Sequence, residues 1–160
     1  MRTILFAILL SVLSVGQAAE AANPVYIMRH LQKAQGDDPP LSDAGAAQAQ
    51  ALASVLGGGG ITAVFATPTK RAMETATPLA ERLGLTVTPY DPNAPQRLVD
   101  AVRAIHGAVL IVGHSNTVPD LVTRFGGAPA PVIGDEDYGT IFIVDPTTHY
   151  VRQMQLRAAK

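Results

Sequence analysis

The chain has 160 residues, of which 48% are hydrophobic, a formal net charge of −1 and no cysteine. This length is typical of one domain with one core. The near-neutral charge gives no sign of a surface for nucleic acid or membrane, so neither is expected as a partner. The absence of cysteine excludes disulfides and thiolate chemistry.

The start of the chain differs in composition from the rest. Arg2 precedes an apolar run at 4–13, and a small-residue motif ends at Ala21. This layout is typical of a secretory signal peptide, and the run is too short to be a comfortable permanent membrane span. The sequence therefore predicts a signal peptide at 1–21, export to the periplasm or the medium, and no stable membrane anchor. One folded domain is expected over 24–157.

The first half of this domain predicts two strand–helix units. Apolar runs of β-favouring residues indicate buried strands, and apolar residues spaced three and four apart indicate helices that begin at polar caps. Pro78 is expected to kink or divide the second helix, and Gly84 is expected to end it. The expected elements are a strand at 25–28, a helix from Ser42 or Asp43 to about Leu56, a strand at 61–66, and a helix from Thr67 or Thr69 to Leu83.

The second half continues this alternation and ends on two strands. The run at 109–112 is the most apolar in the domain, which predicts a central strand. Alternating strands and helices predict an α/β three-layer sandwich with a mostly parallel central sheet and helices on both faces. The expected elements are a strand at 85–88, a helix at 96–106, the strand at 109–112, a helix at 117–125, and strands at 140–144 and 150–154.

Polar residues of a few chemical types follow four of the predicted strands. Open α/β sheets bind ligands at the carboxyl ends of their strands, so these positions are where a site is expected. A single arginine or histidine in such a place is more often structural than functional, but several that converge on one edge favour a site. In strand order these residues are Arg29 and His30, then Thr67 and Arg71, then Tyr90 and Asp91, and finally His114, Ser115 and Asn116.

This set of side chains suits a phosphate group. Two guanidinium groups can bind phosphate oxygens bidentately, and the helix expected after His114 would add backbone N–H donors. A neutral imidazole is a competent nucleophile toward phosphorus, and a second imidazole can stabilise charge in the transition state. A nearby carboxylic acid can protonate the leaving oxygen. The residue types thus indicate phosphoryl-transfer chemistry.

Four short motifs resemble those of the histidine phosphatase (phosphoglycerate mutase-like) superfamily and occur in the same order. Each motif alone is weak, but together they span essentially the whole predicted domain. Leu31 departs from the family, which usually has glycine there, and Thr67 replaces a common serine. The matching segments are Arg29-His30, the helix start Pro40–Gly45, Thr67–Ala76 with its arginine, and Val112–Asn116.

The resemblance implies a role for each matching residue. His30 would attack phosphorus and become phosphohistidine, and water would then hydrolyse this intermediate. Neither a metal nor a cofactor is implied. The residues expected to bind the substrate phosphate are Arg29, Arg71, His114, Ser115 and Asn116.

Larger members of the family carry an acidic proton donor in an insertion after the third strand. This chain has only the short loop 89–95 at that place. Asp91 is the carboxylate in the loop, which makes it the candidate proton donor. The short loop also indicates an open pocket, which favours hydrolysis over a phosphomutase reaction that must exclude water.

Three other functions fit parts of the pattern. An inactive phosphate-binding member of the same fold is possible because of Leu31, and a phosphomutase would use the same nucleophile. A two-histidine metal hydrolase needs a further ligand near both histidines, and His106 and His149 lie at poor places for one. The expected partner is a phosphorylated small molecule or a phosphoprotein, and not a nucleic acid.

Overall fold

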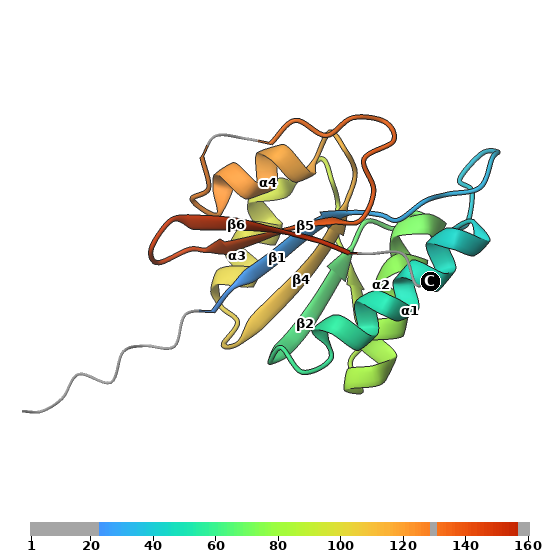
Figure 1. Ribbon diagram of the computed structural model, residues 1–160. Helices are drawn as coiled ribbons and strands as arrows, with labels where there is room; N and C mark the ends of the chain where they lie inside the picture. The colour runs from blue at the N-terminus through green and yellow to red at the C-terminus, as the bar shows by residue number, and fades with distance from the viewer. Residues whose placement is uncertain (1–22, 129–130, 157–160) are drawn as a thin grey trace, which may run out of the picture.

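Residues 23–128 and 131–156 are described by the computed structural model in Figure 1. The predicted signal peptide lies outside the described residues, as does position 157. Strands and helices alternate close to the predicted positions. The elements are β1 (Val25–Arg29), α1 (Asp43–Leu56), β2 (Ile61–Ala66), α2 (Lys70–Leu83), β3 (Val87–Pro89), α3 (Pro95–Arg103), β4 (Ala108–Gly113), α4 (Val118–Arg124), β5 (Thr140–Asp145) and β6 (Tyr150–Gln155).

The strands form one six-stranded sheet in the order β3-β2-β4-β1-β5-β6. The neighbours among β3, β2, β4 and β1 are parallel, whereas β5 is antiparallel to β1 and to β6. β4 lies in the middle of the parallel part and is buried along its whole length, as its apolar sequence predicts. The predicted fold class, an α/β fold with a mostly parallel sheet, is confirmed.

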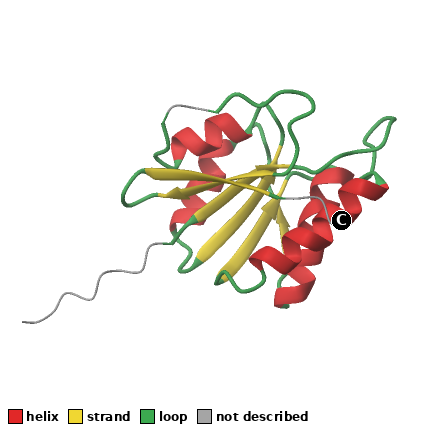
Figure 2. Cartoon of the chain, viewed as in Figure 1, coloured by secondary structure: helices red, strands yellow, loops and turns green. Residues whose placement is uncertain are grey.

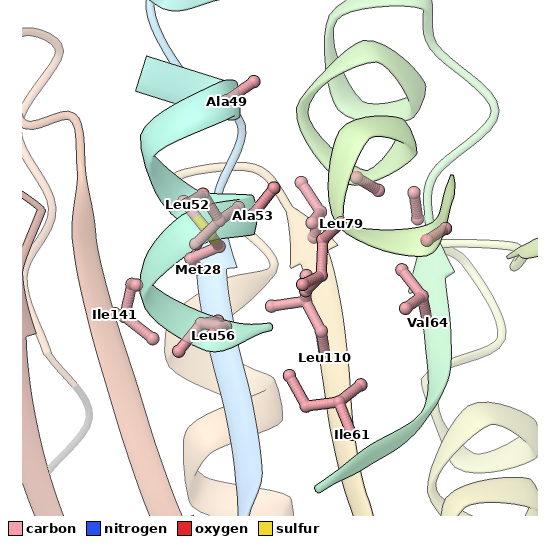
Figure 3. Packing of buried hydrophobic residues seen from close by; sticks show 14 of the residues in the cluster. Met28, Ala49, Leu52, Ala53, Leu56, Ile61, Val64, Leu79, Leu110 and Ile141 are labelled. Carbon is pink, nitrogen blue, oxygen red and sulfur yellow. The ribbon is translucent and has the colours of Figure 1, made fainter. Parts of the chain in front are cut away.

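Helices cover both faces of this sheet (Figure 2). On one face, Leu52 of α1 and Leu79 of α2 pack with Met28 of β1 (Figure 3). On the other face, Leu98 of α3 and Leu121 of α4 belong to a second apolar cluster. Each such leucine contributes about 1.5–3 kcal/mol through burial. Because successive residues of a strand point to opposite faces, β1 and β4 supply apolar side chains to both clusters.

Two local predictions differ from the structure. β3 begins at Val87 rather than at 85, because Gly84 adopts a left-handed conformation and the N–H of Leu85 still bonds the carbonyl of Ala80 in α2. α2 is not divided by proline and runs unbroken to Leu83. The carbonyl that loses its helical partner to Pro78 belongs to Glu74, an exposed residue, so water can satisfy it.

The pairing of β1 with β4 determines where the two sequence-predicted histidines lie. Arg29 and Gly113 are partners in this parallel ladder, and the N–H of His30 donates to the carbonyl of Gly113 at 2.9 Å. His30 and His114 therefore leave neighbouring strands at the same level of the sheet.

No helix in the described part of the chain is long and apolar enough to cross a membrane.

Candidate active site

The imidazole rings of His30 and His114 form a pair at the carboxyl end of the sheet. Their centroids are 5.3 Å apart and their planes meet at 66°, an edge-to-face arrangement. The two residues are far apart in the sequence, and the β1–β4 register is what brings them together. A phosphoryl group held between them would contact both rings.

A backbone hydrogen bond sets the tautomer of His30. Its Nδ1 lies 2.8 Å from the carbonyl oxygen of Leu31. Because a carbonyl can only accept, the proton must sit on Nδ1, and Nε2 then carries the free lone pair. Burial, together with the nearby positive charges of Arg71 and Arg29, lowers the pKa of His30 to about 4. The ring is therefore neutral at neutral pH, which is the state that a nucleophile needs.

His114 is also neutral and is held from the side by a buried hydroxyl. Burial is the main cause that lowers the pKa of His114 to about 4, and the charges of Arg71 and Arg29 act in the same direction. The Nε2 of His114 and the Oγ1 of Thr67 are 2.8 Å apart, and Thr67 is fully buried. The hydroxyl that replaces the family's serine thus orients the second histidine.

Arg71 reaches the histidine pair from the first turn of α2. One of its Nη atoms lies 3.4 Å from the Oδ1 of Asp38, and the same oxygen accepts the N–H of Lys70 at 3.1 Å. The Nε of Arg71 is buried and has no hydrogen-bond partner among the described residues. A buried N–H without a partner is costly, so this group is suited to an incoming anion. Asp38 comes from the loop after β1 and was not predicted.

Arg29 is almost completely buried, and it holds the loop before β5. Its Nη1 donates to the carbonyls of Gly134 and Asp135, both at 2.8 Å, and to that of Asp137 at 3.4 Å. Its guanidinium carbon lies 4.3 Å from the centroid of the Tyr138 ring. The Nε of Arg29, like that of Arg71, is buried without a partner in the described part of the chain. Arg29 is therefore both a structural anchor and a free donor.

The backbone beside His30 is fixed by a side chain of α2. The N–H of Leu31 donates to the Oγ1 of Thr75 at 3.0 Å, and this hydroxyl in turn donates to the carbonyl of Arg71 at 2.7 Å. Leu31 does not adopt a positive φ, and its side chain is fully buried in the α1–α2 core. The usual glycine is therefore not needed here, and the leucine adds to the core.

The start of α1 packs directly on the same loop. Ser42 caps the helix by accepting the N–H of Gly45, and the N–H of Ser42 donates to the carbonyl of Gln32 at 2.9 Å. A Cβ at Gly45 would overlap the backbone carbonyl of Gln32. The glycine of this motif thus allows the helix to approach the loop that follows His30.

The helix expected at 117–125, after His114, is α4 and lies within one residue of its predicted bounds. A turn at 115–117 intervenes, and α4 begins only at Val118. The N–H of His114 donates to the hydroxyl of Thr117, and the N–H groups of Thr117 and Val118 bond the carbonyl of His114. These three N–H groups are used within the turn and are therefore not free to bind a phosphate.

The other predicted site residues are placed less centrally. Ser115 is half-buried and Asn116 is exposed, both in the turn that follows the second histidine. The carboxylate of Asp91 is exposed and accepts the N–H of Asn93 at 2.8 Å in a local turn. No hydrogen bond within the described residues connects Asp91 to either histidine. Its surroundings are those of a turn-forming residue.

The site also contains residues for which the sequence offered little signal. Thr75 lies inside a matching motif, so its role could have been suspected from that position. Asp38 and Tyr138 lie in loops that have no periodic pattern. Tyr138 faces His30 with 6.0 Å between ring centroids. Only the folded chain shows that these two loops meet the site.

The arrangement combines two neutral imidazoles with two arginines. His30 is only 3% exposed, so it is more deeply buried than the short loops suggested. Both arginines keep a buried N–H free, and both carry charge close to the two rings. Such a group of side chains can bind a tetrahedral dianion and offer it a nucleophile. Within the described chain, no group of three or more His, Asp or Glu residues is arranged to hold a metal ion.

Comparisons with known proteins agree with this geometry. A family model described as the histidine phosphatase superfamily (branch 1) matches residues 25–92, which include His30 and Arg71. No curated protein matches the chain.

Solved structures of phosphatases share the fold. A mycobacterial glucosyl-3-phosphoglycerate phosphatase is 17% identical with a TM-score of 0.67, over 86% of this chain and 100% of that one. The structure of that phosphatase in complex with inorganic phosphate is 20% identical with a TM-score of 0.65, and the match covers 84% of this chain and 95% of that one. The protein histidine phosphatase SixA complexed with tungstate is 22% identical with a TM-score of 0.63, and the match covers 82% of this chain and 96% of that one. The chain is thus similar to branch 1 of the histidine phosphatase superfamily over residues 25–92, and it shares the fold of these phosphatases.

Proposed function

We propose that this protein is a phosphatase that hydrolyses phosphomonoesters, free or on a protein, through a phosphohistidine intermediate on His30. The observation that carries the proposal is the hydrogen bond from Nδ1 of His30 to the carbonyl of Leu31. It leaves Nε2 as an unprotonated nucleophile 5.3 Å, centroid to centroid, from a second neutral imidazole. Two arginines with free buried N–H groups complete an anion site.

In the first step, Nε2 of His30 attacks phosphorus and the bond to the leaving oxygen breaks. Arg29, Arg71 and His114 surround the position where negative charge gathers on the equatorial oxygens, and they stabilise it there. In the second step, water attacks the phosphohistidine and releases inorganic phosphate. Only residues 90–94 connect β3 to α3, so no long insertion at that place closes over the site. This supports hydrolysis over transfer to a second substrate position.

Turnover of p-nitrophenyl phosphate tests the proposal. We expect activity in the wild type, its loss in His30→Ala, and a loss of about 10²–10³-fold or more in His114→Ala. His106→Ala is the matched control, because His106 is exposed and far from the pair in the fold. Phosphate binding without turnover in the wild type would contradict the proposal and would indicate an inactive phosphate-binding member.

Trapping of the intermediate identifies the nucleophile. A brief incubation with a labelled phosphate ester, quenched in detergent at alkaline pH, should leave label on the wild type and none on His30→Ala. The label should be lost in acid, as is expected of a phosphoramidate bond. Label on the His30→Ala variant would exclude His30 as the nucleophile.

We also propose that the protein is exported to the periplasm or the medium. The support is the composition of residues 1–21, with a basic start, an apolar run and a small-residue motif. N-terminal sequencing of the protein from fractionated cells tests this. A mature chain that starts near Ala22 is expected, and an uncut chain in the cytoplasm would contradict it.

A further inference from the structure

Among the described residues, neither the predicted acid Asp91 nor Asp38 beside Arg71 is placed to protonate the leaving oxygen in the proposed phosphatase site. Asp91 is exposed and tied into a local turn by the N–H of Asn93. Asp38 is bound to Arg71 and to the N–H of Lys70, and as a carboxylate it can only accept. Alkyl phosphates have poor leaving groups, so their hydrolysis depends on a proton donor.

Tyr138 is a donor that the fold holds at the site. Its ring centroid lies 6.0 Å from that of His30, and its planar face is covered by the guanidinium of Arg29 at 4.3 Å. The loop that carries it is anchored because Arg29 donates to the carbonyls of Gly134, Asp135 and Asp137. The ring is half-buried beside the nucleophile as a result.

The hydroxyl of Tyr138 has a free proton. The Nη2 of Arg29 donates to this hydroxyl at 3.4 Å, so the oxygen acts as the acceptor in that contact. Its own O–H is left to donate elsewhere, and no other protein partner for it occurs among the described residues. A guanidinium at this distance also stabilises the phenolate that forms when the proton leaves.

We propose that Tyr138 is the general acid of the reaction, an inference that rests on the proposed phosphatase function. As Nε2 of His30 bonds to phosphorus and the P–O bond to the leaving group breaks, the proton of Tyr138 passes to the leaving oxygen and an alcohol departs. The phenolate is held by Arg29. In the second step, the phenolate takes a proton from the attacking water, whose oxygen bonds to phosphorus as the P–N bond breaks. Tyrosine and histidine are both restored.

Two esters with different leaving groups separate this role from a structural one. p-Nitrophenolate is a good leaving group and departs without being protonated. The alkoxide of glycerol 2-phosphate is a poor leaving group and needs a proton as the P–O bond breaks. In Tyr138→Phe we expect kcat/KM for glycerol 2-phosphate to fall by about 10²–10⁴-fold, and that for p-nitrophenyl phosphate by less than about 3-fold. The variant keeps the ring over Arg29, so the fold and the stacking are preserved.

Tyr150→Phe is the matched control, because Tyr150 is exposed on β6, and neither ester should change. An equal loss on both esters in Tyr138→Phe would overturn the proposal in favour of a positioning role, and no loss on either would exclude Tyr138 altogether. If the wild type hydrolyses neither ester and takes up no label on His30, the phosphatase proposal itself fails. Activity in the wild type with an unaffected variant refutes only the role of Tyr138.

Discussion

The backbone N–H of Leu31 donates to the hydroxyl of Thr75 at 3.0 Å, and both residues are fully buried. This bond joins the residue after the proposed nucleophile to the helix that carries Arg71. The carbonyl of the same leucine accepts the Nδ1–H of His30. One hydroxyl on α2 therefore fixes the peptide that determines the tautomer of His30.

Replacing Thr75 by valine should remove the hydrogen bond that its hydroxyl accepts from the N–H of Leu31. Valine keeps the shape but leaves the N–H of Leu31 buried without a partner, at a cost of about 1–3 kcal/mol in the free energy of unfolding. Thr75→Ser keeps the hydroxyl and should lose only about 1 kcal/mol for the methyl group. Urea unfolding and p-nitrophenyl phosphate turnover check both. We expect activity to fall in the valine variant and to persist in the serine variant, and equal behaviour of the two would contradict this explanation.

The sequence predicted the strands and their polar ends well because each of those signals is local. An apolar run of β-favouring residues marks a strand wherever it lies, and Arg29-His30 and His114 each follow such a run. That the two histidines meet depends on β1 pairing with β4, a long-range choice. The histidines were expected at one edge because open α/β sheets bind ligands at the carboxyl ends of their strands, but no pattern in the sequence predicted that β1 pairs with β4.

The missed residues are those that reach the site from irregular loops. Tyr138 lies between α4 and β5, where no periodicity constrains the chain, and its place depends on three carbonyls that bind Arg29. Asp38 depends likewise on the N–H of Lys70. Asp91 is the opposite case. Its position in the sequence suggested a catalytic acid, but the structure places its carboxylate in a local turn.

Glycine at position 45 should be required for the close packing of α1 on the loop that follows His30. A Cβ there would overlap the carbonyl of Gln32, so Gly45→Ala must push α1 and this loop apart, at about 1–3 kcal/mol. Turnover should fall as well, since Gln32 lies two residues from His30. The matched control is Gly58→Ala, because a Cβ at this position would have no other atom within 4 Å. Its free energy of unfolding should change by no more than about 0.5 kcal/mol. Thermal melts and phosphatase assays compare the two, and equal effects would be inconsistent with the close contact.

Asp38 should weaken anion binding through its charge. Its carboxylate contacts Arg71, and its φ of 41° is a conformation that asparagine tolerates, so Asp38→Asn removes the charge with little strain. An exposed pair is worth about 0.2–1 kcal/mol, which converts to about 1.5- to 5-fold tighter binding of inorganic phosphate. Titration calorimetry measures this directly. Asp37→Asn, on an exposed neighbour, should change binding less, and 0.5 M salt should reduce the difference. Weaker binding of phosphate to the Asp38→Asn variant would refute the idea that Asp38 competes with phosphate for Arg71.

The two buried histidines should make the fold sensitive to acid. Their pKa values are about 4 in the folded state, against an ordinary value of 6.5, because burial disfavours the charged form. Between pH 6.5 and 4 the unfolded chain therefore binds more protons than the folded one, so stability falls as the pH falls. Each histidine adds a slope of at most about 1.4 kcal/mol per pH unit, and the half-buried His114 adds less.

Urea unfolding at pH 4, 5, 6 and 7 measures this slope in the wild type and in the double variant His30→Gln/His114→Gln. Carboxylates contribute to both curves, so the difference between them isolates the two imidazoles. We expect the wild type to lose stability relative to the double variant as the pH falls through this window, and the gap to level off below about pH 4. Parallel curves for the wild type and the double variant would mean that the rings take up protons in the folded state, and His30 would then be a poor nucleophile in mild acid.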